Sequence, residues 1–269
     1  MRLGLLTSVE TRHRYFVNRI RRAFPVSAVA YERIGYAPAE VDRDNLSPDE
    51  ARIVAHHFAE RTRQEALFFG QESDLVPDDG TCTVRRLEPG RLNTDQTCRF
   101  LKSAGVNTLV VYGTNLVKEP LLSQWSDCMI NLHLGLSPYY RGTATNFYPL
   151  LNEEPEYVGA TIHLLDAGID SGPIFKHVRP VITADDGPHT IGCKAIQVGI
   201  EAMIEVLKRW ERLAAVPVPQ WQTPNAKLYL RRDYHPRQVV ELYRKLEVGL
   251  IPRYVQRAEQ TVRRIRLIE

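Results

Sequence analysis

The most informative stretch of the chain is the run Cys128-Met129-Ile130-Asn131-Leu132-His133-Leu134, which is apolar except at two positions. A short apolar run of this kind predicts a buried β-strand. Side chains alternate between the faces of a strand, so Asn131 and His133 share one face while the aliphatic residues between them pack on the other. The turn-forming residues 135–138 then end the strand, which places the amide and the imidazole near its C-terminal edge, where open α/β sheets bind ligands.

A single polar residue at a strand end is more often a hydrogen-bonded structural group than a catalyst. Here two further polar segments accompany the pair, a combination that packing alone would not require. Residues 138–142 form a Pro-Tyr-Tyr-Arg-Gly loop, and Asp170 stands between two glycine-containing turns further along the chain. This combination favours a catalytic interpretation.

A carboxamide, an imidazole and a carboxylate at one place suit chemistry that passes through a tetrahedral oxyanion, either acyl transfer to an amine or hydrolysis of an acyl group. The amide of Asn131 and a protonated His133 can donate hydrogen bonds to the oxyanion, and Asp170 can stabilise the imidazolium. No serine or cysteine stands in a nucleophile elbow, which favours direct transfer over an acyl-enzyme.

The composition of the 269 residues is that of an ordinary globular protein, with a formal net charge of +3. Because Lys/Arg and Asp/Glu are interspersed, charge gives no argument for a nucleic-acid partner. The basic segment 263–266 fits a solvated helix end. The N-terminal residues 1–6 are too short for a signal peptide, and no apolar run approaches eighteen residues, so neither secretion nor a membrane span is expected.

The four cysteines lie far apart, at positions 82, 98, 128 and 193, and form no Cys-x-x-Cys pair. With no Cys/His cluster at zinc-like spacing, we expect no metal site and reduced thiols in a cytoplasmic protein. The adjacent His56 and His57 point about 100° apart on a predicted helix, so they cannot serve one metal ion together. We interpret them as surface or interface residues, and contact with substrate stays open as the alternative.

The order of predicted elements indicates an α/β fold: a Rossmann-like mixed β-sheet with helices on both faces and a small C-terminal helical appendage. Strands are expected at 2–6, 26–31, 82–86, 107–112, 128–134, 160–164, 173–181 and 228–230, and helices at 11–24, 47–69, 95–104, 119–125, 145–151, 189–212, 236–246 and 252–267. The strands around Asp170 are expected to pair antiparallel. Segment 35–45 is polar and turn-rich. We predict a catalytic domain over 1–215 and a C-terminal extension over 216–269.

The turn after the first predicted strand, residues 7–14, contains no glycine. Loops that cradle a dinucleotide or phosphate need glycines so that backbone N–H groups can approach the anion. A nicotinamide-binding function is therefore disfavoured.

Several motifs in collinear order resemble those of the folate-dependent formyltransferases. They are Asn131-Leu132-His133, Leu136-Ser137-Pro138 with Tyr140-Arg141-Gly142, Gly159-Ala160-Thr161-Ile162-His163, and Ile169-Asp170-Ser171-Gly172. The resemblance spans roughly residues 109–175 and is thinner outside that region. It implies that Asn131 and His133 polarise a formyl group and that Asp170 orients and charges His133. His163, on a predicted strand, is interpreted as structural.

The resemblance also implies N10-formyltetrahydrofolate as co-substrate. The residues that would contact its pterin are Tyr112, Gly113, Thr114, Asn115, Leu116, Val117, Leu165, Asp166, Ala167 and Gly168. Candidate acceptor-binding residues are Tyr140, Arg141 and Asn146, each of which could instead be loop scaffolding. Gly113 could merely end a strand, and Asp166 could merely shape a turn.

The sequence departs from the family pattern in three places. Leu134-Gly135 stands where many members have Pro-Ser after the histidine, which leaves the geometry around the oxyanion open. The glycine-rich phosphate loop of glycinamide ribonucleotide enzymes is absent, and the residues after Pro224 are too few for the barrel that methionyl-tRNA formyltransferases append. By elimination, we expect the primary amine of a small molecule as acceptor, with a nucleotide-linked amino sugar as the favoured choice.

Other functions stay open at this point: formyltetrahydrofolate hydrolysis, a methionyl-tRNA formyltransferase-like activity, and a non-catalytic folate- or RNA-binding role, for which the basic C-terminal helix is the only hint. The two terminal helices are candidate elements of a homodimer.

Overall fold

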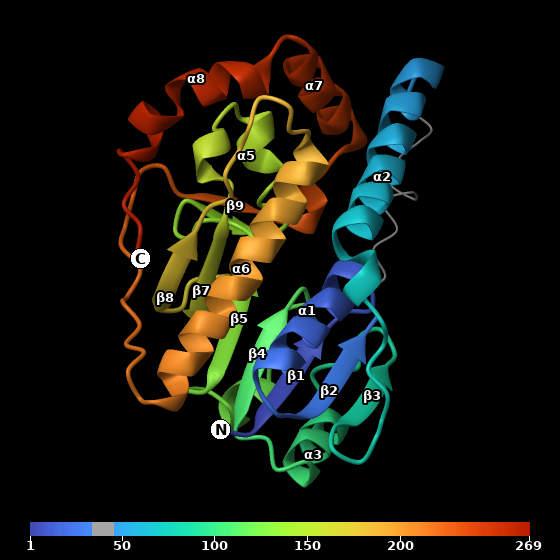
Figure 1. Cartoon of the computed structure of the whole chain (residues 1–269), viewed down its shortest axis with the longest axis vertical. Coiled ribbons are helices and arrows are strands. Elements are labelled where there is room, and N and C mark those ends of the chain that lie inside the picture. Colours follow the sequence, from blue (N-terminus) through green and yellow to red (C-terminus); the bar gives the residue numbers. More distant parts are fainter. Residues whose placement is uncertain (34–45) are drawn as a thin grey trace.

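The structure is a computed structural model of the chain and describes residues 1–33 and 46–269, so the predicted turn-rich segment 35–45 lies outside the described residues. Seven strands form one mixed sheet in the order β3-β2-β1-β4-β5-β7-β8 (Figure 1). They are β1 (Leu3–Thr7), β2 (Val26–Glu32), β3 (Thr83–Leu87), β4 (Thr108–Tyr112), β5 (Met129–His133), β7 (Ala160–Leu164) and β8 (Ile174–Val178). The first five strands are parallel, and β7 is antiparallel to both β5 and β8. The predicted Rossmann-like mixed sheet is confirmed.

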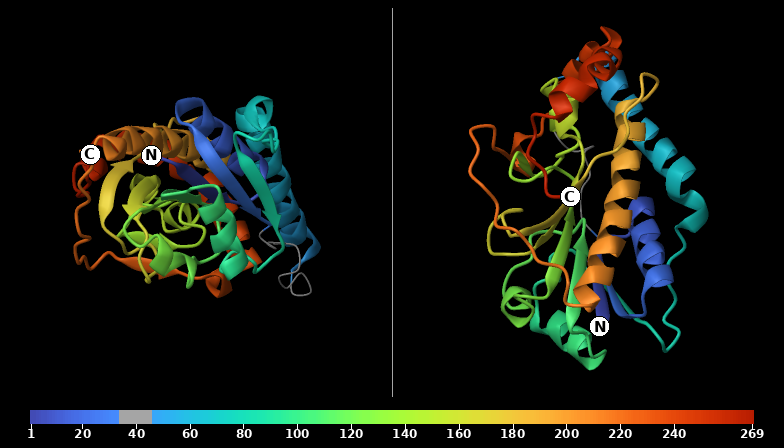
Figure 2. Two further views of the ribbon diagram at one scale, coloured as in Figure 1. Left: turned by 90° about the horizontal axis from the view of Figure 1, so that it is seen from below. Right: turned by 60° about the vertical axis from the view of Figure 1, so that its left-hand side comes forward.

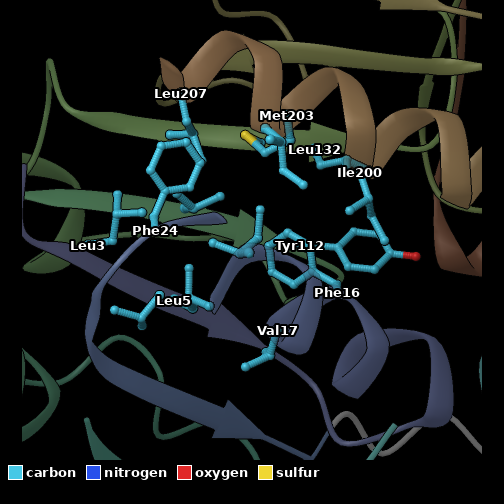
Figure 3. Packing of buried hydrophobic residues seen from close by; sticks show 14 of the residues in the cluster. Leu3, Leu5, Phe16, Val17, Phe24, Tyr112, Leu132, Ile200, Met203 and Leu207 are labelled. Carbon is cyan, nitrogen blue, oxygen red and sulfur yellow. The ribbon is translucent and has the colours of Figure 1, made fainter. Parts of the chain in front are cut away.

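Helices cover both faces of the sheet. The helices α1 (Thr11–Ala23) and α6 (Pro188–Glu211) pack on one face with α2 (Pro48–Phe69) beside them, and α3 (Asp95–Ser103) and α4 (Leu121–Gln124) lie on the other. Figure 3 shows the first interface, where Phe16 of α1 and Met203 of α6 meet Leu132 of the sheet. Burial of these apolar side chains on both faces is the main force that holds the layers together.

The strand β5 has the alternation that the sequence predicts. Ile130 and Leu132 belong to the apolar cluster under α6, whereas Met129 belongs to the cluster on the opposite face. Asn131 and His133 share the parity of Met129, so both project on that opposite face. The strand therefore brings an amide and an imidazole to one side of the sheet.

Prolines shorten two predicted helices. The predicted helix 119–125 is only α4, because Pro120 disfavours a helical conformation at the residue before it. The predicted helix 145–151 is only α5 (Tyr148–Leu151), which begins so that Pro149 stands in its first turn, where a missing N–H costs no hydrogen bond. By contrast, α2 begins as predicted, with a capping box between Ser47 and Glu50.

The C-terminal part of the chain returns to the sheet. The connector after α6 forms an isolated bridge between Val218 and Ile174 of β8 and is the orange trace beside the sheet in Figure 2. The strand β9 (Lys227–Tyr229) then pairs in parallel with β6 (Tyr140–Gly142), which the sequence had indicated as loop. The helices α7 (Pro236–Glu247) and α8 (Leu250–Val262) follow and pack near α5 and α2.

Three short 3-10 helices complete the secondary structure of the described residues: Gly70–Glu72, Pro155–Tyr157 and Arg231–Asp233. Over 1–33 and 46–269, no helix combines the length and the apolar character needed to cross a membrane.

Candidate functional site

The side chains of Asn131, His133 and Asp170 meet at the C-terminal half of β5. The Nδ1 atom of His133 lies 3.3 Å from Oδ2 of Asp170, and its Nε2 atom lies 2.9 Å from the backbone carbonyl of Tyr140. Because a carbonyl oxygen can only accept a hydrogen bond, Nε2 must carry the proton. In the neutral ring the lone pair is therefore on Nδ1, beside the carboxylate.

A second histidine fixes the orientation of Asn131. Nδ1 of His163 lies 2.7 Å from the carbonyl oxygen of Leu164, so this nitrogen donates and Nε2 accepts. The Nδ2 atom of Asn131 donates to that Nε2 over 3.1 Å. One of the two amide hydrogens of Asn131 is thus used inside the protein, and the other is left for a ligand.

The carboxylate of Asp170 and the backbone of its loop are each held by hydrogen bonds. The N–H of Gly142 donates to Oδ2 over 2.8 Å, and Gln220 donates through Nε2 to the carbonyl oxygens of Asp170 and Gly172 over 2.8 and 2.9 Å. Asp170 has a φ of 48°, a left-handed conformation that aspartate tolerates better than most residues. The loop is therefore fixed in a conformation that aims Asp170 at His133.

Burial and charge set the protonation of this pair. Burial lowers the pKa of His133 below its usual value, although the neighbouring Asp170 counteracts part of that effect. Burial alone would raise the pKa of Asp170, but His133, His163, whose Nε2 lies 3.7 Å from Oδ1, and the N–H of Gly142 hold it well below its usual range. Near neutral pH the site therefore pairs a neutral imidazole with an ionised carboxylate.

All three side chains line a cavity of about 830 Å³. One end of this cavity is bounded by the loop after β4, residues 112–118, and by Leu165 and residues 168–170. The other end is bounded by α2, by the first turns of α6 and by Tyr234. The imidazole and the carboxylate stand between the two ends.

The loop after β4 is rigidly held. Asn115 donates to Glu32 over 2.9 Å and accepts a hydrogen bond from Arg231 over 2.8 Å. Asn93 donates to the carbonyl oxygen of Leu116 over 2.9 Å, while the side chain of Leu116 lines the cavity and is 52% exposed. A fixed backbone beside an exposed apolar side chain suits a flat heterocycle that would cover it.

A family model described as "Formyl transferase" matches residues 49–207, more than half of the chain. The chain belongs to the formyl transferase family. The resemblance drawn from the motifs between residues 109 and 175 is thereby confirmed.

Curated relatives of this formyl transferase family member include methionyl-tRNA formyltransferases. The protein of Thermodesulfovibrio yellowstonii is 33% identical over 141 residues, which cover 52% of this chain and 45% of the relative. The protein of Thermus thermophilus is 35% identical over 133 residues, which cover 49% and 43%. The chain thus spans about half the length of these relatives.

Solved structures of low sequence identity share the fold. The phosphoribosylglycinamide formyltransferase of Anaplasma phagocytophilum superposes with a TM-score of 0.57 at 15% identity, covering 86% of this chain and 97% of that one. An N-formyltransferase of Helicobacter canadensis, solved with folinic acid and dTDP-3-aminofucose, gives a TM-score of 0.55 at 15% identity, covering 92% and 82%.

The structure brings most of the predicted site residues to the cavity. Those that line it are Asn131, His133, Asp170, Tyr112, Gly113, Thr114, Asn115, Leu116, Val117, Leu165, Gly168 and Asn146. Asn146 also accepts a hydrogen bond from the N–H of Gly159 over 3.2 Å.

Four predicted residues lie outside the lining. Asp166 accepts hydrogen bonds from Gly168 and Ser171 within its own loop, next to Ala167. Tyr140 is buried, with its hydroxyl on Glu154, and Arg141 follows it in β6. Pairing with β9 turns this part of the loop into a strand, and the ring of Tyr140 packs into the apolar cluster that includes α5.

Three residues in or around the site were missed by the sequence analysis. His163 contacts Asn131 because β7 pairs with β5 in a register that sets these two residues opposite each other. Gln220 reaches the site from a connector fifty positions away. His57 is only 6% exposed and lines the cavity, so its assignment as a surface or interface residue was wrong; α2 turns it toward α6. Only His163 had a local signal, its position in the Gly-Ala-Thr-Ile-His motif.

Among the described residues, no group of three or more His, Cys, Asp or Glu side chains is arranged to hold a metal ion.

Proposed function

We propose that this protein transfers the formyl group of N10-formyltetrahydrofolate to the primary amine of a small molecule, with a nucleotide-linked amino sugar as the favoured acceptor. The observation that carries the proposal is the geometry at His133: its lone pair on Nδ1 faces the cavity wall beside Asp170, 3.3 Å away, within reach of the amide of Asn131. This arrangement can accept a proton and stabilise an oxyanion in one place.

The residues after β4 fit the folate. The half-exposed Leu116 and the buried Val117 offer an apolar surface, and Leu165 faces the cavity from the opposite loop. Gly113 has a φ of +61°, and the ring of His13 occupies the place where a Cβ would stand, so only glycine fits at this turn. When bound, the folate supplies the formyl group and a nitrogen leaving group.

The chain's own residues account for the rest of the reaction. The remaining N–H of Asn131 donates to the formyl oxygen as negative charge develops on it. Nδ1 of His133 accepts the proton that the attacking amine loses, because Nε2 is already protonated and bound to the carbonyl of Tyr140. Asp170 stabilises the resulting imidazolium, which returns a proton to the leaving nitrogen.

The site residues keep their sequence-derived roles as part of this proposal. Asn131, His133 and Asp170 act on the formyl group, and residues 112–117 and 165–168 contact the pterin. We further propose that residues 1–215 form the catalytic domain and that residues 216–269 brace it. In support, Gln220 bonds the Asp170 loop, β9 pairs with β6, and Arg231 bonds Asn115.

Two comparisons bear on the chemical class of the acceptor, and each favours a different one. The structure of the Helicobacter canadensis enzyme, solved with dTDP-3-aminofucose, aligns with 92% of this chain, which favours an amino-sugar nucleotide. The relatives with about a third of identical residues are methionyl-tRNA formyltransferases, which makes an aminoacyl-tRNA the second candidate. Water as acceptor would make the protein a formyltetrahydrofolate hydrolase.

One experiment separates these functions. The full chain is incubated with N10-formyltetrahydrofolate that carries a labelled formyl group, in the presence of amino-sugar nucleotides, amino acids or aminoacyl-tRNA. We expect label in an amino-sugar nucleotide; label only in aminoacyl-tRNA, or formate released without any amine, would replace the favoured acceptor by the corresponding alternative.

The catalytic assignment is tested with Asn131→Ala. Loss of one oxyanion donor is expected to lower turnover by about a hundredfold or more while folate binding is largely kept. Asn225→Ala, the same change at an exposed turn, serves as control and should leave the rate unchanged. A nearly unchanged rate in Asn131→Ala would refute the assignment.

A further inference from the structure

The wall of the cavity away from the folate loop carries two buried histidines. His57 comes from the middle of α2 and His189 from the first turn of α6, and their ring centroids are 4.4 Å apart. They are only 6% and 8% exposed, and both line the cavity. Nothing in the proposed chemistry at His133 uses them.

Each of these histidines has a buried nitrogen that lacks a partner among the residues that the structure describes: Nδ1 of His57 and Nε2 of His189. Burial lowers the pKa of His57 to about 3 and that of His189 to about 4, so both rings are neutral near pH 7. Leaving such polar atoms unpaired reduces stability. Sites that keep unpaired buried groups commonly do so for a ligand.

The first turn of α6 lies at the same wall of the cavity as these two histidines. Its residues Pro188, His189 and Gly192 line the cavity. The N-cap of this 24-residue helix is Gly187, which has no side chain and whose N–H donates to the hydroxyl of Thr190; the carboxylate of Asp186 just before it is paired with Lys194. Unsatisfied N–H groups and the helix dipole make such a terminus attractive to an anion. Figure 1 shows this end of α6 facing α2 and α7 above the sheet.

Arginine side chains add positive charge to this wall. Arg61 lies one helical turn after His57 and lines the cavity, with Nε 4.0 Å from Oε1 of Glu65. The guanidinium of Arg12 contacts the same carboxylate at 2.8 Å, so two guanidinium groups share Glu65. Of the other carboxylates nearby, Glu10 contacts His13 at 2.6 Å and Glu60, which also acts on His189, contacts Arg63 at 2.7 Å.

We propose that the start of α6, together with His57, His189 and Arg61, is a binding site for the phosphate or diphosphate group of the acceptor. The inference rests on the proposed function and specifies it. Nδ1 of His57 would donate to a phosphate oxygen. His189, which also bonds the backbone of His57, would donate through Nε2 when the phosphate charge stabilises its protonated ring. Bound this way, the acceptor would direct its amine toward His133 in the same cavity.

The test uses inorganic pyrophosphate as the probe and needs no turnover. Pyrophosphate is titrated into the full chain in the calorimeter, with and without saturating 5-formyltetrahydrofolate. We expect binding in both conditions with similar affinity, because the proposal places pyrophosphate on residues of α2 and α6 and the folate on residues 112–117 and 165–168. Failure of pyrophosphate to bind at millimolar concentration overturns the proposal. Mutual exclusion of the two ligands would instead assign the histidines to the anionic tail of the folate and also overturns it.

Variants locate the site. His57→Phe keeps the ring contacts with Phe58 and Phe147 but removes both nitrogens, and is expected to weaken pyrophosphate binding by about tenfold or more. His56→Phe, the same change at the exposed neighbouring residue, is the matched control and should bind like the unaltered protein. Equal affinity in the two variants contradicts the proposal.

A spectroscopic measurement covers the case in which His57→Phe does not fold. The imidazole 15N signals of His57 and His189 in the unaltered chain should shift on addition of pyrophosphate, and those of His177, which is buried on the carbonyl of Ser137, should not. Unmoved signals at both cavity histidines overturn the inference. If pyrophosphate binds as expected but no amine is formylated, the proposed function fails while the anion site stands. If an amine is formylated but pyrophosphate does not bind, the anion site fails while the proposed function stands.

Discussion

Gly135 offers a sharp test of the site, because its hydrogen faces the imidazole that we place at the centre of the reaction. A Cβ at this position would lie 2.5 Å from Nε2 of His133, 2.7 Å from Cβ of Thr145 and 2.8 Å from the carbonyl oxygen of Tyr140. Ordinary contact begins at 3.4 Å, so relief of all three contacts requires shifts of about 0.9 Å at His133, about 0.7 Å at Thr145 and about 0.6 Å at the carbonyl of Tyr140. The added methyl group also stands next to the bond from Nε2 to Tyr140, which fixes the tautomer.

The magnitude follows from these distances. Overpacking of this kind typically costs about 1–3 kcal/mol of unfolding free energy. A misplacement of about 1 Å at a catalytic group can cost on the order of a hundredfold in rate. We therefore expect Gly135→Ala to stay folded, to bind 5-formyltetrahydrofolate nearly as well as the unaltered chain, and to transfer formyl about a hundredfold more slowly.

The assay combines urea unfolding, folate titration and transfer of labelled formyl to the acceptor identified with the panel of amines. Gly70→Ala is the matched control, because a Cβ there meets no atom within 4 Å and the backbone is helical. Its rate should be unchanged. A rate for Gly135→Ala within threefold of the unaltered chain would refute the claim that His133 must stay on the carbonyl of Tyr140.

Three further predictions concern protonation, bracing and stability. His133 must be neutral to accept a proton and burial lowers its pKa, so kcat/KM should fall only below about pH 6.5. Asp170→Asn removes a negative charge and lowers the pKa of His133 further. The acidic limb of its pH–rate profile should therefore move to lower pH while kcat drops, as measured with one amine for both proteins. An acidic limb that moves upward would contradict this electrostatic assignment. Gln220→Ala removes two hydrogen bonds to the Asp170 loop and should lower kcat by roughly tenfold with folate affinity kept. The control Gln222→Ala, at an exposed neighbouring position, should leave kcat unchanged. Equal rates in the two variants would exclude a bracing role for Gln220. Ser47→Ala breaks the capping box with Glu50 and should cost about 1 kcal/mol, read by urea unfolding, without an effect on rate; an unchanged unfolding midpoint would show that the cap is not formed in solution.

The local pattern of the chain was sufficient for most elements. The alternation in 128–134 predicted both the strand β5 and the common face of Asn131 and His133, because a strand's period of two is independent of what packs around it. Ser47 followed by Pro48 predicted the start of α2 for the same kind of reason, since capping involves only neighbouring residues. The motifs between 109 and 175 likewise indicated the family.

The tertiary structure alone decided which distant residues complete the site. Asn131 and His163 are opposite each other through the β5 and β7 register, and β6 becomes a strand only when β9, 87 positions later, pairs with it. Gln220 reaches the Asp170 loop, and His57 and His189 reach the cavity, through tertiary packing of the same kind. Neither periodicity nor spacing encodes such contacts, because they depend on how the amphipathic faces of separate elements pack, and that is settled by the burial of the whole core.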